Sequence, residues 1–432
     1  MVIVNFAKIR SRASSFGIWL LLFYCFSYKL KIIGQNAERP LYILGVIAAT
    51  IWLTLFIQSF KSLLARILSI RPVLLTSILL CFLFLAFQAL LYPATISASL
   101  YSVVPIFLLS CISVSSIGLY GLERTVSNVS VALITYSLIN IALGAGVLIA
   151  PSLYQYLPVL PSESGYGLRF AGLAGDPTHL GGFFSITLLL MFVLRRKFHH
   201  WWFFLAFLLI FVGLLSTGSR NSVLSFFVGA CLAVFASGDL KRNLKKLVYL
   251  CIGLSLLLRV LYLTIPDSEM LLDALFRISD QNSFSRFNIL QDMFGAANGL
   301  HVHEILFGGG FLFVQDFYGS PYNAFVRIFF NQGMLFLIFF VSVLVQVVVL
   351  ASRDKCRLRR GLVFALLGYW ITFSLFLDTL FAEFFHVSEF PFWLAVSIVA
   401  TSGLGDAFPK VLSSMRGVGS VARSVQGATL SN

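Results

Sequence analysis

Charged residues are scarce in this chain. Asp, Glu, Lys and Arg together make up 11% of its 432 residues, whereas a soluble protein averages roughly 25%. Hydrophobic residues reach 59%, and the mean hydropathy is +0.93. This shortage of charge excludes a soluble enzyme of ordinary composition and a disordered chain. The class that matches is a polytopic α-helical membrane protein.

Cysteine is also sparse, with six in the whole chain. The cysteines lie within apolar runs or in one basic loop, and none lies in a long polar segment. This distribution excludes a secreted disulfide scaffold and predicts no disulfide on the outer face of a membrane. The N-terminus carries basic residues and then an apolar run without a small-residue cleavage site, which predicts a first span rather than a cleaved signal.

Continuous apolar runs, separated by polar segments, recur along the chain. A spanning helix needs about 20 apolar residues, so twelve would use roughly 240 residues, in agreement with the hydrophobic fraction. The runs predict spans at 16–34, 41–60, 72–92, 97–119, 129–150, 178–194, 201–217, 221–237, 247–265, 325–350, 361–380 and 388–405. The predicted fold is therefore all-α and polytopic, with about twelve transmembrane helices in one integral membrane domain, residues 1–432.

Basic residues indicate the orientation, because cytoplasmic loops are enriched in Lys and Arg. With a cytoplasmic N-terminus, 22 of the 31 basic residues fall in alternate segments on the cytoplasmic side. Both termini are then cytoplasmic, with a tail at 406–432, and two long segments lie outside, at 151–177 and 266–324. The net charge of +14 does not indicate nucleic-acid binding, because the basic residues form short clusters between apolar runs.

Nine basic residues lie on the outer side or near the outer ends of spans, where the positive-inside rule disfavours them. They are Lys29, Lys31, Arg39, Arg169, Arg220, Arg259, Arg277, Arg286 and Arg327. Because topology does not explain their placement, we expect residues of a functional site among them.

A polar turn, Ser216–Asn221, separates two short predicted spans and contains Arg220. A guanidinium can bind a phosphate through two parallel hydrogen bonds. The neighbouring hydroxyls and the N–H groups that open the next helix favour the same anion. The alternative is an arginine whose side chain simply extends from a helix end to the membrane interface.

The segment from Arg169 to Gly182 leads into the predicted sixth span. Asp176 is expected to cap this helix with its side chain, and Pro177 suits the first helical position. His179, in the first turn, could carry a proton or bind a hydroxyl. The alternative is an interfacial histidine without a chemical role.

The large outer segment contains an amphipathic stretch, 271–294, that is typical of a helix on the membrane surface. Arg286, in Ser-Phe-Ser-Arg, is a candidate anion ligand. The alternative is an ion pair with Asp280 or Asp292. Arg277 would lie on the opposite face of such a helix, so the two arginines would not form one clamp.

His301, His303 and Glu304 form a short cluster in the same outer segment. Such a cluster could be half of a metal site, but the sequence shows no matching partner cluster, so we predict no metal. A proton-transfer role and a solvated loop are the other interpretations. Gly308–Gly310, just after the cluster, is either a turn or a backbone nest for an anion.

Tyr322 and Asn323 precede the predicted tenth span, and Arg327 lies one turn into it. Asn323 and Arg327 share a helix face and could hold a polar ligand. The alternative is an interfacial aromatic anchor followed by an arginine that extends to the interface. Arg259, within the predicted ninth span, either pairs with Asp378 or binds a ligand.

Taken in order, these motifs resemble the O-antigen ligase and polymerase superfamily of membrane glycosyltransferases, which includes Wzy-type polymerases and WaaL-type ligases. After the arginine-bearing outer loop, the landmarks are Gly-Asp-Pro (175–177), Ser-Thr-Gly-Ser-Arg (216–220), Ser-Phe-Ser-Arg (283–286), Phe-Gly-Gly-Gly (307–310) and Pro-Tyr-Asn (321–323). They cover about residues 165–345, and the first five spans contribute only topology.

The resemblance implies about a dozen helices in the bacterial inner membrane, with a large periplasmic loop. It implies transfer of glycans linked to undecaprenyl diphosphate, with no cofactor and no metal. Arg220 and Arg286 would bind the diphosphate, with Arg169 assisting. The candidate bases are His179, His303, Glu304 and Asp176, and Tyr322, Asn323 and Arg327 are further substrate contacts.

Tyr322 stands where ligases of this superfamily usually carry a histidine, and this favours a repeat-unit polymerase over a ligase. The expected partners are the lipid-linked oligosaccharide, the bilayer, a flippase and a chain-length regulator. The alternatives are a ligase that transfers the glycan to a lipid or protein acceptor, and a glycolipid flippase. A flippase would have internal repeats and short loops, and this sequence has neither feature.

Overall fold

The structure is a computed structural model of the 432-residue chain. It describes residues 31–32, 35–36, 64–65, 67–93, 96–149, 160–161, 168–169, 172–174, 176–195, 201–237, 288, 291–295, 299–310, 313–314, 323–375 and 389–402. The helices are α3 (Pro72–Leu91), α4 (Ile96–Tyr120), α5 (Leu122–Ile149), α6 (Pro177–Leu194), α7 (Trp201–Ser216), α8 (Arg220–Ala236), α12 (Val302–Phe307), α14 (Ala324–Ser352), α15 (Arg357–Leu375) and α16 (Glu389–Ala400).

Two short antiparallel strand pairs occur in addition to the helices. Strand β1 (Lys31–Ile32) pairs with β2 (Gln35–Asn36), with Lys31 opposite Asn36. Strand β3 (Leu160–Pro161) pairs with β4 (Leu168–Arg169), with Leu160 opposite Arg169. A short 3-10 helix, η3 (Gly172–Ala174), follows β4 and precedes α6.

Within the described ranges, nine of the predicted spans coincide with helices α3 to α8 and α14 to α16. The predicted first span, 16–34, is wrong at its C-terminal end, because Lys31–Ile32 belong to the β1–β2 hairpin. Helix α5 begins at Leu122, earlier than the predicted 129, because its first turns are polar and apolar content does not mark them. The predicted spans 41–60 and 247–265 lie outside the described residues.

Five helical stretches in the described part are long and apolar enough to cross a membrane. They are Pro72–Leu91, Leu122–Gly146, Pro177–Leu194, Ala324–Ser352 and Arg357–Leu375. Helices α7, α8 and α16 are apolar but shorter. Large hydrophobic side chains are exposed along α3, α7 and α14, among them Val73, Trp201 and Ile338. This pattern is compatible with a helical membrane protein whose outer surface contacts lipid.

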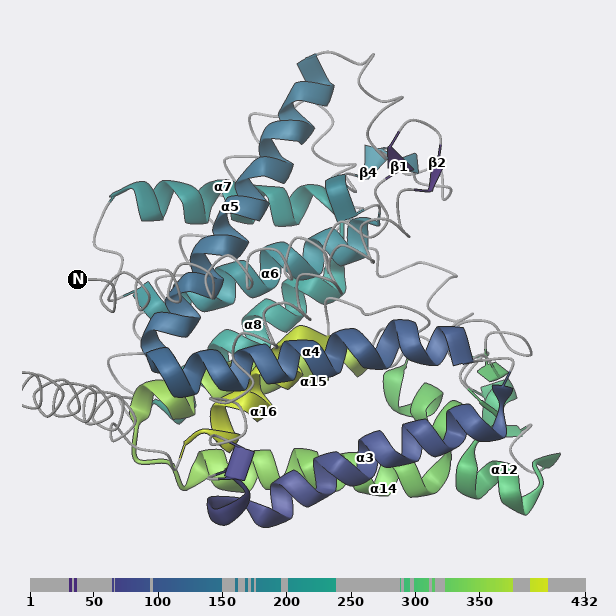
Figure 1. Ribbon diagram of the computed structural model, residues 1–432. Helices are drawn as coiled ribbons and strands as arrows, with labels where there is room; N and C mark the ends of the chain where they lie inside the picture. Colours follow the sequence, from purple (N-terminus) through teal and green to yellow (C-terminus); the bar gives the residue numbers. More distant parts are fainter. Residues whose placement is uncertain are drawn as a thin grey trace, which may run out of the picture.

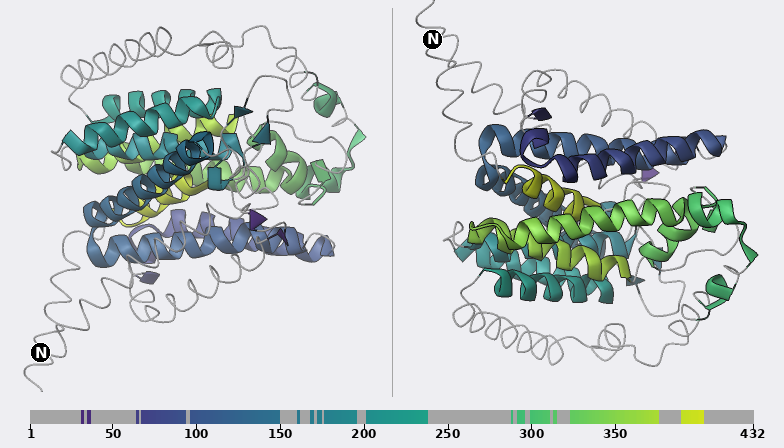
Figure 2. Two further views of the ribbon diagram at one scale, coloured as in Figure 1. Left: turned by 90° about the horizontal axis from the view of Figure 1, so that it is seen from above. Right: turned by 90° about the horizontal axis from the view of Figure 1, so that it is seen from below.

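The long helices pack side by side, so that residues distant in sequence meet (Figure 1 and Figure 2). Helix α3 runs along α14, α8 lies against α15, and α16 packs on α4 and α15. Helix α6 is largely enclosed, because it contacts α5, α7, α8 and α15 and most of its side chains are buried. Its surroundings therefore fix the position of its N-terminus.

Helices α8 and α15 approach closely through small residues, as membrane helices commonly do. A Cβ atom on Gly229 of α8 would lie 2.8 Å from the carbonyl oxygen of Ala365. A Cβ atom on Gly368 of α15 would lie 3.3 Å from the Cα atom of Gly229. The backbones therefore touch directly, and this contact sets the distance between α8 and α15.

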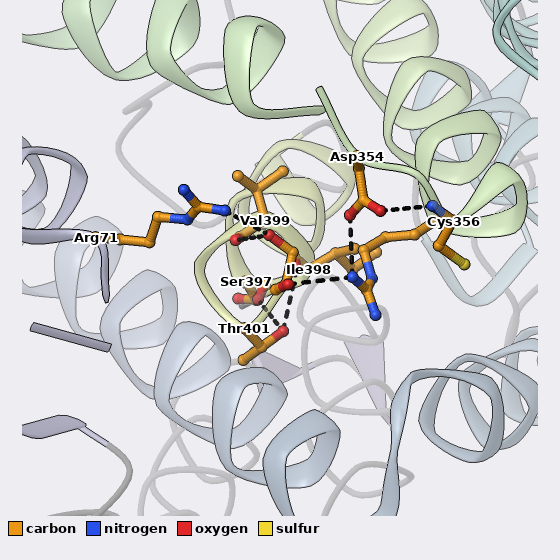
Figure 3. A network of polar contacts seen from close by, with 9 residues as sticks. Arg71, Asp354, Cys356, Ser397, Ile398, Val399 and Thr401 are labelled. Atoms are coloured by element: carbon orange, nitrogen blue, oxygen red, sulfur yellow. Dashed lines mark hydrogen bonds and ion pairs between the residues drawn. The ribbon is translucent and has the colours of Figure 1, made fainter. Parts of the chain in front are cut away.

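Basic residues gather at one end of the bundle, where the α3 and α15 N-termini meet the α16 C-terminus (Figure 3). Arg71 donates to Ser402 Oγ at 3.4 Å. Arg359 donates to Asp354 at 3.0 Å and to the carbonyl of Ser402 at 3.3 Å, and Arg360 donates to the carbonyl of Ala236 at 2.5 Å. These arginines are among those that the sequence predicts on the cytoplasmic side.

Replacing Gly229 by alanine is expected to lower the thermal transition of the purified protein in detergent. The new methyl group would meet the backbone of Ala365, and overpacking of this kind costs roughly 1–3 kcal/mol. Gly361→Ala in α15 is the matched control, because its Cβ atom would lie 3.5 Å from the nearest atom, the carbonyl oxygen of Ala233. An equal destabilisation by both variants would contradict the close α8–α15 contact.

Candidate functional site

The N-terminus of α6 carries the first group of predicted site residues. The Asp176 carboxylate accepts hydrogen bonds from the N–H groups of Thr178 at 2.7 Å and His179 at 3.0 Å. Asp176 is thus the N-cap, with Pro177 at the start of the helix, and both structural predictions are confirmed. His179 is half-buried on the first turn of α6.

The turn between α7 and α8 carries the second group. The Thr217 hydroxyl donates to the carbonyl of Leu214 at 2.7 Å and accepts from the N–H of Ser219 at 3.3 Å. The Ser219 and Ser222 hydroxyl oxygens lie 2.6 Å apart. These bonds hold the turn, and Arg220 follows it as the exposed first residue of α8.

Gly181 brings these two groups together. A Cβ atom at Gly181 would lie 2.8 Å from Ser219 Cβ and 2.9 Å from Thr217 Oγ1. Helix α6 therefore contacts the α7–α8 turn directly. The contact joins Gly181, two residues after His179, to Ser219, the residue before Arg220. The N-termini of α6 and α8 lie at the same end of the bundle, where their N–H groups and dipoles favour an anion.

Asn140 of α5 ties the preceding loop to this end. Its side chain accepts from the N–H of Leu173 at 2.7 Å and donates to the carbonyl of Tyr136 at 2.9 Å. Asn140 is completely buried, so it fixes η3 close to the start of α6. Arg169 precedes η3 in β4, where its backbone pairs with Leu160. The sequence analysis did not indicate Asn140, although a lone amide within an apolar run is a usable signal.

Buried hydroxyl groups join α6 to its neighbours beneath this end. Ser185 donates to the carbonyl of Ser222 at 2.6 Å, and Thr187 shares a hydrogen bond with Ser137 at 3.1 Å. Tyr369 of α15 donates to the carbonyl of Gly182 at 3.1 Å. Polar groups buried in this way are satisfied within the protein and hold the four helices in one arrangement.

The start of α14 lies at the same end, across the last turns of α15. Asn323 caps α14 by accepting from the N–H groups of Phe325 at 3.0 Å and Val326 at 3.1 Å, and its amide donates to the carbonyl of Leu375 at 3.3 Å. Leu375 is the last residue of α15, about 9 Å along the axis from Tyr369. Helix α15 thus lies between the start of α6 and the start of α14.

Arg327 differs from the snorkelling arginine that was one interpretation of the sequence. Its side chain is only 7% exposed, so it is enclosed by protein instead of extending to the surface. The sequence predicted that Asn323 and Arg327 could hold a ligand together. In the structure the Asn323 side-chain oxygen caps α14 and is therefore already in use. Arg327 is therefore a charge inside the bundle, near the start of α14.

His301, His303 and Glu304 lie at the start of α12. The Glu304 carboxylate accepts from the N–H of His301 at 2.8 Å, and the two imidazole rings stack with centroids 5.6 Å apart. Within the described ranges, no group of three or more His, Cys, Asp or Glu side chains is placed to hold a metal ion. Burial and the nearby charge of Glu304 raise the pKa of the Tyr92 phenol.

Gly308–Gly310 form a structural contact and not an anion nest. The N–H of Gly308 donates to the carbonyl of Glu304 at 2.8 Å. The N–H groups of Gly309 and Gly310 donate to the carbonyls of Phe330 and Asn331 at 2.9 Å and 3.0 Å. Because α12 and α14 carbonyls already occupy all three donors, the nest interpretation is wrong.

Several predicted residues lie outside the described residues. They are Arg259, Arg277, Asp280, Arg286, Tyr322 and Asp378. Their roles stay predictions. No protein-family model matches the chain, and no curated protein sequence matches it.

Asp176→Ala is expected to lower the free energy of unfolding by about 1 kcal/mol, because two N–H groups of α6 lose their acceptor. Asp176→Asn keeps a side-chain oxygen in the same place and is expected to stay within a few tenths of a kcal/mol of the wild type. Chemical denaturation in detergent micelles would measure both. Equal losses in the two variants would show that the negative charge, and not the capping oxygen, stabilises α6.

Proposed function

We propose that this protein is a membrane glycosyltransferase that polymerises oligosaccharide repeat units linked to undecaprenyl diphosphate. The observation that supports this proposal is the convergence of predicted site residues at one end of the bundle. Asp176 and His179 of α6 lie beside the α7–α8 turn that precedes Arg220, because Gly181 permits direct contact. The start of α14 lies across α15 from them.

In the proposed reaction, a hydroxyl of the incoming lipid-linked repeat unit attacks the anomeric carbon of the growing chain. The bond from that carbon to the diphosphate oxygen breaks, and undecaprenyl diphosphate leaves with the electron pair. A base takes the hydroxyl proton. The diphosphate becomes a better leaving group as positive groups neutralise its charge, and these groups are most effective where water is excluded.

The charges at this end of the bundle suit that task. Arg220 is exposed and stands at the N-terminus of α8, where its guanidinium and the helix dipole act on the same anion. Arg169 and Arg286 are proposed to complete the diphosphate site. Arg327, which is enclosed within the bundle, is proposed to add positive electrostatic potential at the diphosphate site. Tyr322 and Asn323 are proposed to contact the sugar.

The base is proposed to be His179, His303 or Glu304. Asp176, the fourth candidate, already accepts two backbone hydrogen bonds as the N-cap of α6. His179 is half-buried in the first turn of α6, two residues before the glycine that contacts the α7–α8 turn, and its neutral form can accept a proton. No metal and no cofactor is needed for this scheme.

The proposal includes about twelve spans in the bacterial inner membrane, with both termini and the 406–432 tail in the cytoplasm. The segments 151–177 and 266–324 would face the periplasm, where a flippase delivers the lipid-linked repeat unit and a chain-length regulator acts. The clustering of Arg71, Arg359 and Arg360 at the end opposite the candidate site supports this orientation.

Arg220→Ala is expected to abolish chain extension, because a bidentate phosphate ligand is removed. Arg220→Lys is expected to restore little, since an ammonium is a point charge and cannot form the paired hydrogen bonds. Separation of the glycans of a deletion strain complemented with each variant would measure chain length. The same loss is expected for Arg286→Ala.

The control for this experiment is Arg124→Ala, which removes an exposed arginine from the first turn of α5. It should leave chain length unchanged, and all variants should insert in the membrane in equal amounts. Polymer of full length in Arg220→Ala would contradict the proposal. Loss of every surface glycan, including single repeats, would indicate a flippase instead.

A cysteine introduced at Ser283 is expected to react with a membrane-impermeant thiol reagent on intact spheroplasts. The reason is that 266–324 carries few basic residues, whereas the segments on the other side carry most of them. The label would be measured after removal of the native cysteines. Reaction only after lysis would reverse the orientation and leave the proposed enzyme without a substrate.

A further inference from the structure

Helix α14 contains a break at Gly333, and the segment 301–310 is docked on it. Gly333 has φ 83° and ψ 173°, a backbone conformation that is essentially restricted to glycine. Such a break interrupts the hydrogen-bond ladder of a helix. Carbonyl groups of Phe330 and Asn331, just before the break, accept from Gly309 and Gly310. The glycine segment thus satisfies polar backbone groups that a membrane helix cannot leave unpaired.

Gln88, on the last turn of α3, binds both sides of this contact. Its Nε2 donates to the carbonyl of Phe307 at 3.0 Å and also to the carbonyl of Asn331. The side chain is 1% exposed. Within the part of the chain that the structure describes, its Oε1 accepts no hydrogen bond. The contribution of Gln88 to the contact therefore comes from its two donor bonds.

The surroundings of Gln88 strengthen these bonds. The Tyr92 hydroxyl donates to the carbonyl of Gly308 at 2.6 Å. The Phe307 ring packs on Phe84 and Phe87, with ring centroids 6.2 Å and 5.9 Å apart. Because Gln88 is buried, loss of its donors would deprive the Phe307 carbonyl of this bond away from water, whereas the Asn331 carbonyl would keep the bond from Gly310.

We propose that Gln88 is a positioning residue that holds α12, and with it His303 and Glu304, at a fixed place on α3 and α14. Helix α12 has only six residues, so it cannot maintain its own position. Its C-terminal residue, Phe307, is bound by Gln88, and Glu304 lies one turn earlier on the same short helix. The catalytic consequence of this positioning rests on the proposed function, whereas the anchoring itself does not.

The test compares Gln88→Met with Gln346→Met in purified protein. Methionine keeps the length of the glutamine side chain and removes its donors. Gln346 of α14 is the matched control, because it also joins α14 to α3, donating to Ser77 Oγ at 2.9 Å and to Ser342 Oγ at 3.0 Å. It lies farther along α14, away from the Gly333 break.

The first measurement is hydrogen exchange of peptides that cover 301–310, and it requires no activity. Gln88→Met is expected to increase exchange there about tenfold, and Gln346→Met to leave it unchanged. Unchanged exchange in Gln88→Met would overturn the proposal. Comparable exchange increases in both variants would also overturn it, because the effect would then reflect a general loosening of α3 against α14.

The second measurement is polymerisation of lipid-linked repeat units by the same proteins. Gln88→Met is expected to lower kcat at least about tenfold with a smaller change in KM, because a misplaced base affects the chemical step. If the wild type does not polymerise, the proposed function fails while the exchange result still decides the anchoring. Equal kcat in Gln88→Met and wild type would overturn the positioning role.

Discussion

The direct contact between α6 and the α7–α8 turn is the constraint on which the candidate site depends. It exists because Gly181 carries no side chain, so that Ser219 and Thr217 can approach the backbone of α6. Below it, Ser185 and Tyr369 bind α6 to α8 and α15 through buried hydrogen bonds. A buried polar contact of this kind has few alternatives in a low-dielectric interior, so the relative position of the two helix N-termini is well determined.

A second constraint is the break in α14. The helix is broken at Gly333, and its freed carbonyls are satisfied by a segment that enters from a distant part of the sequence. Irregular backbone is tolerated at membrane depth only where protein groups satisfy it. Gly308 is therefore required for close approach to α14, because a Cβ atom there would meet the backbone of Asn331. The N–H groups of Gly309 and Gly310 are already used in this contact, so the proposed diphosphate site does not include them.

The candidate site combines capped helix N-termini, which are held in place, with an exposed arginine side chain. Asp176 and Asn323 hold the first turns of α6 and α14 as capping residues, while Arg220 is exposed at the start of α8 and able to meet a ligand. Under the proposed function, a carrier with a long lipid tail would present its diphosphate at the membrane surface. An exposed arginine beside two helix N-termini is suited to such an anion.

The sequence by itself indicated a helical protein of membrane-like composition, the positions of nine helices and the N-cap at Asp176, because long apolar runs and a Gly-Asp-Pro start are local signals. It did not determine the Lys31–Asn36 hairpin, the buried state of Arg327 or the use of the Gly308–Gly310 donors. The strand pair is local but lies within an apolar run that masks it, whereas the Gly308–Gly310 donors meet Phe330 and Asn331 only in the tertiary structure. The sequence does not distinguish the roles of Gly181, Gly229 and Gly333. The packing around them shows that the first two permit close contact between segments and that the third interrupts a helix.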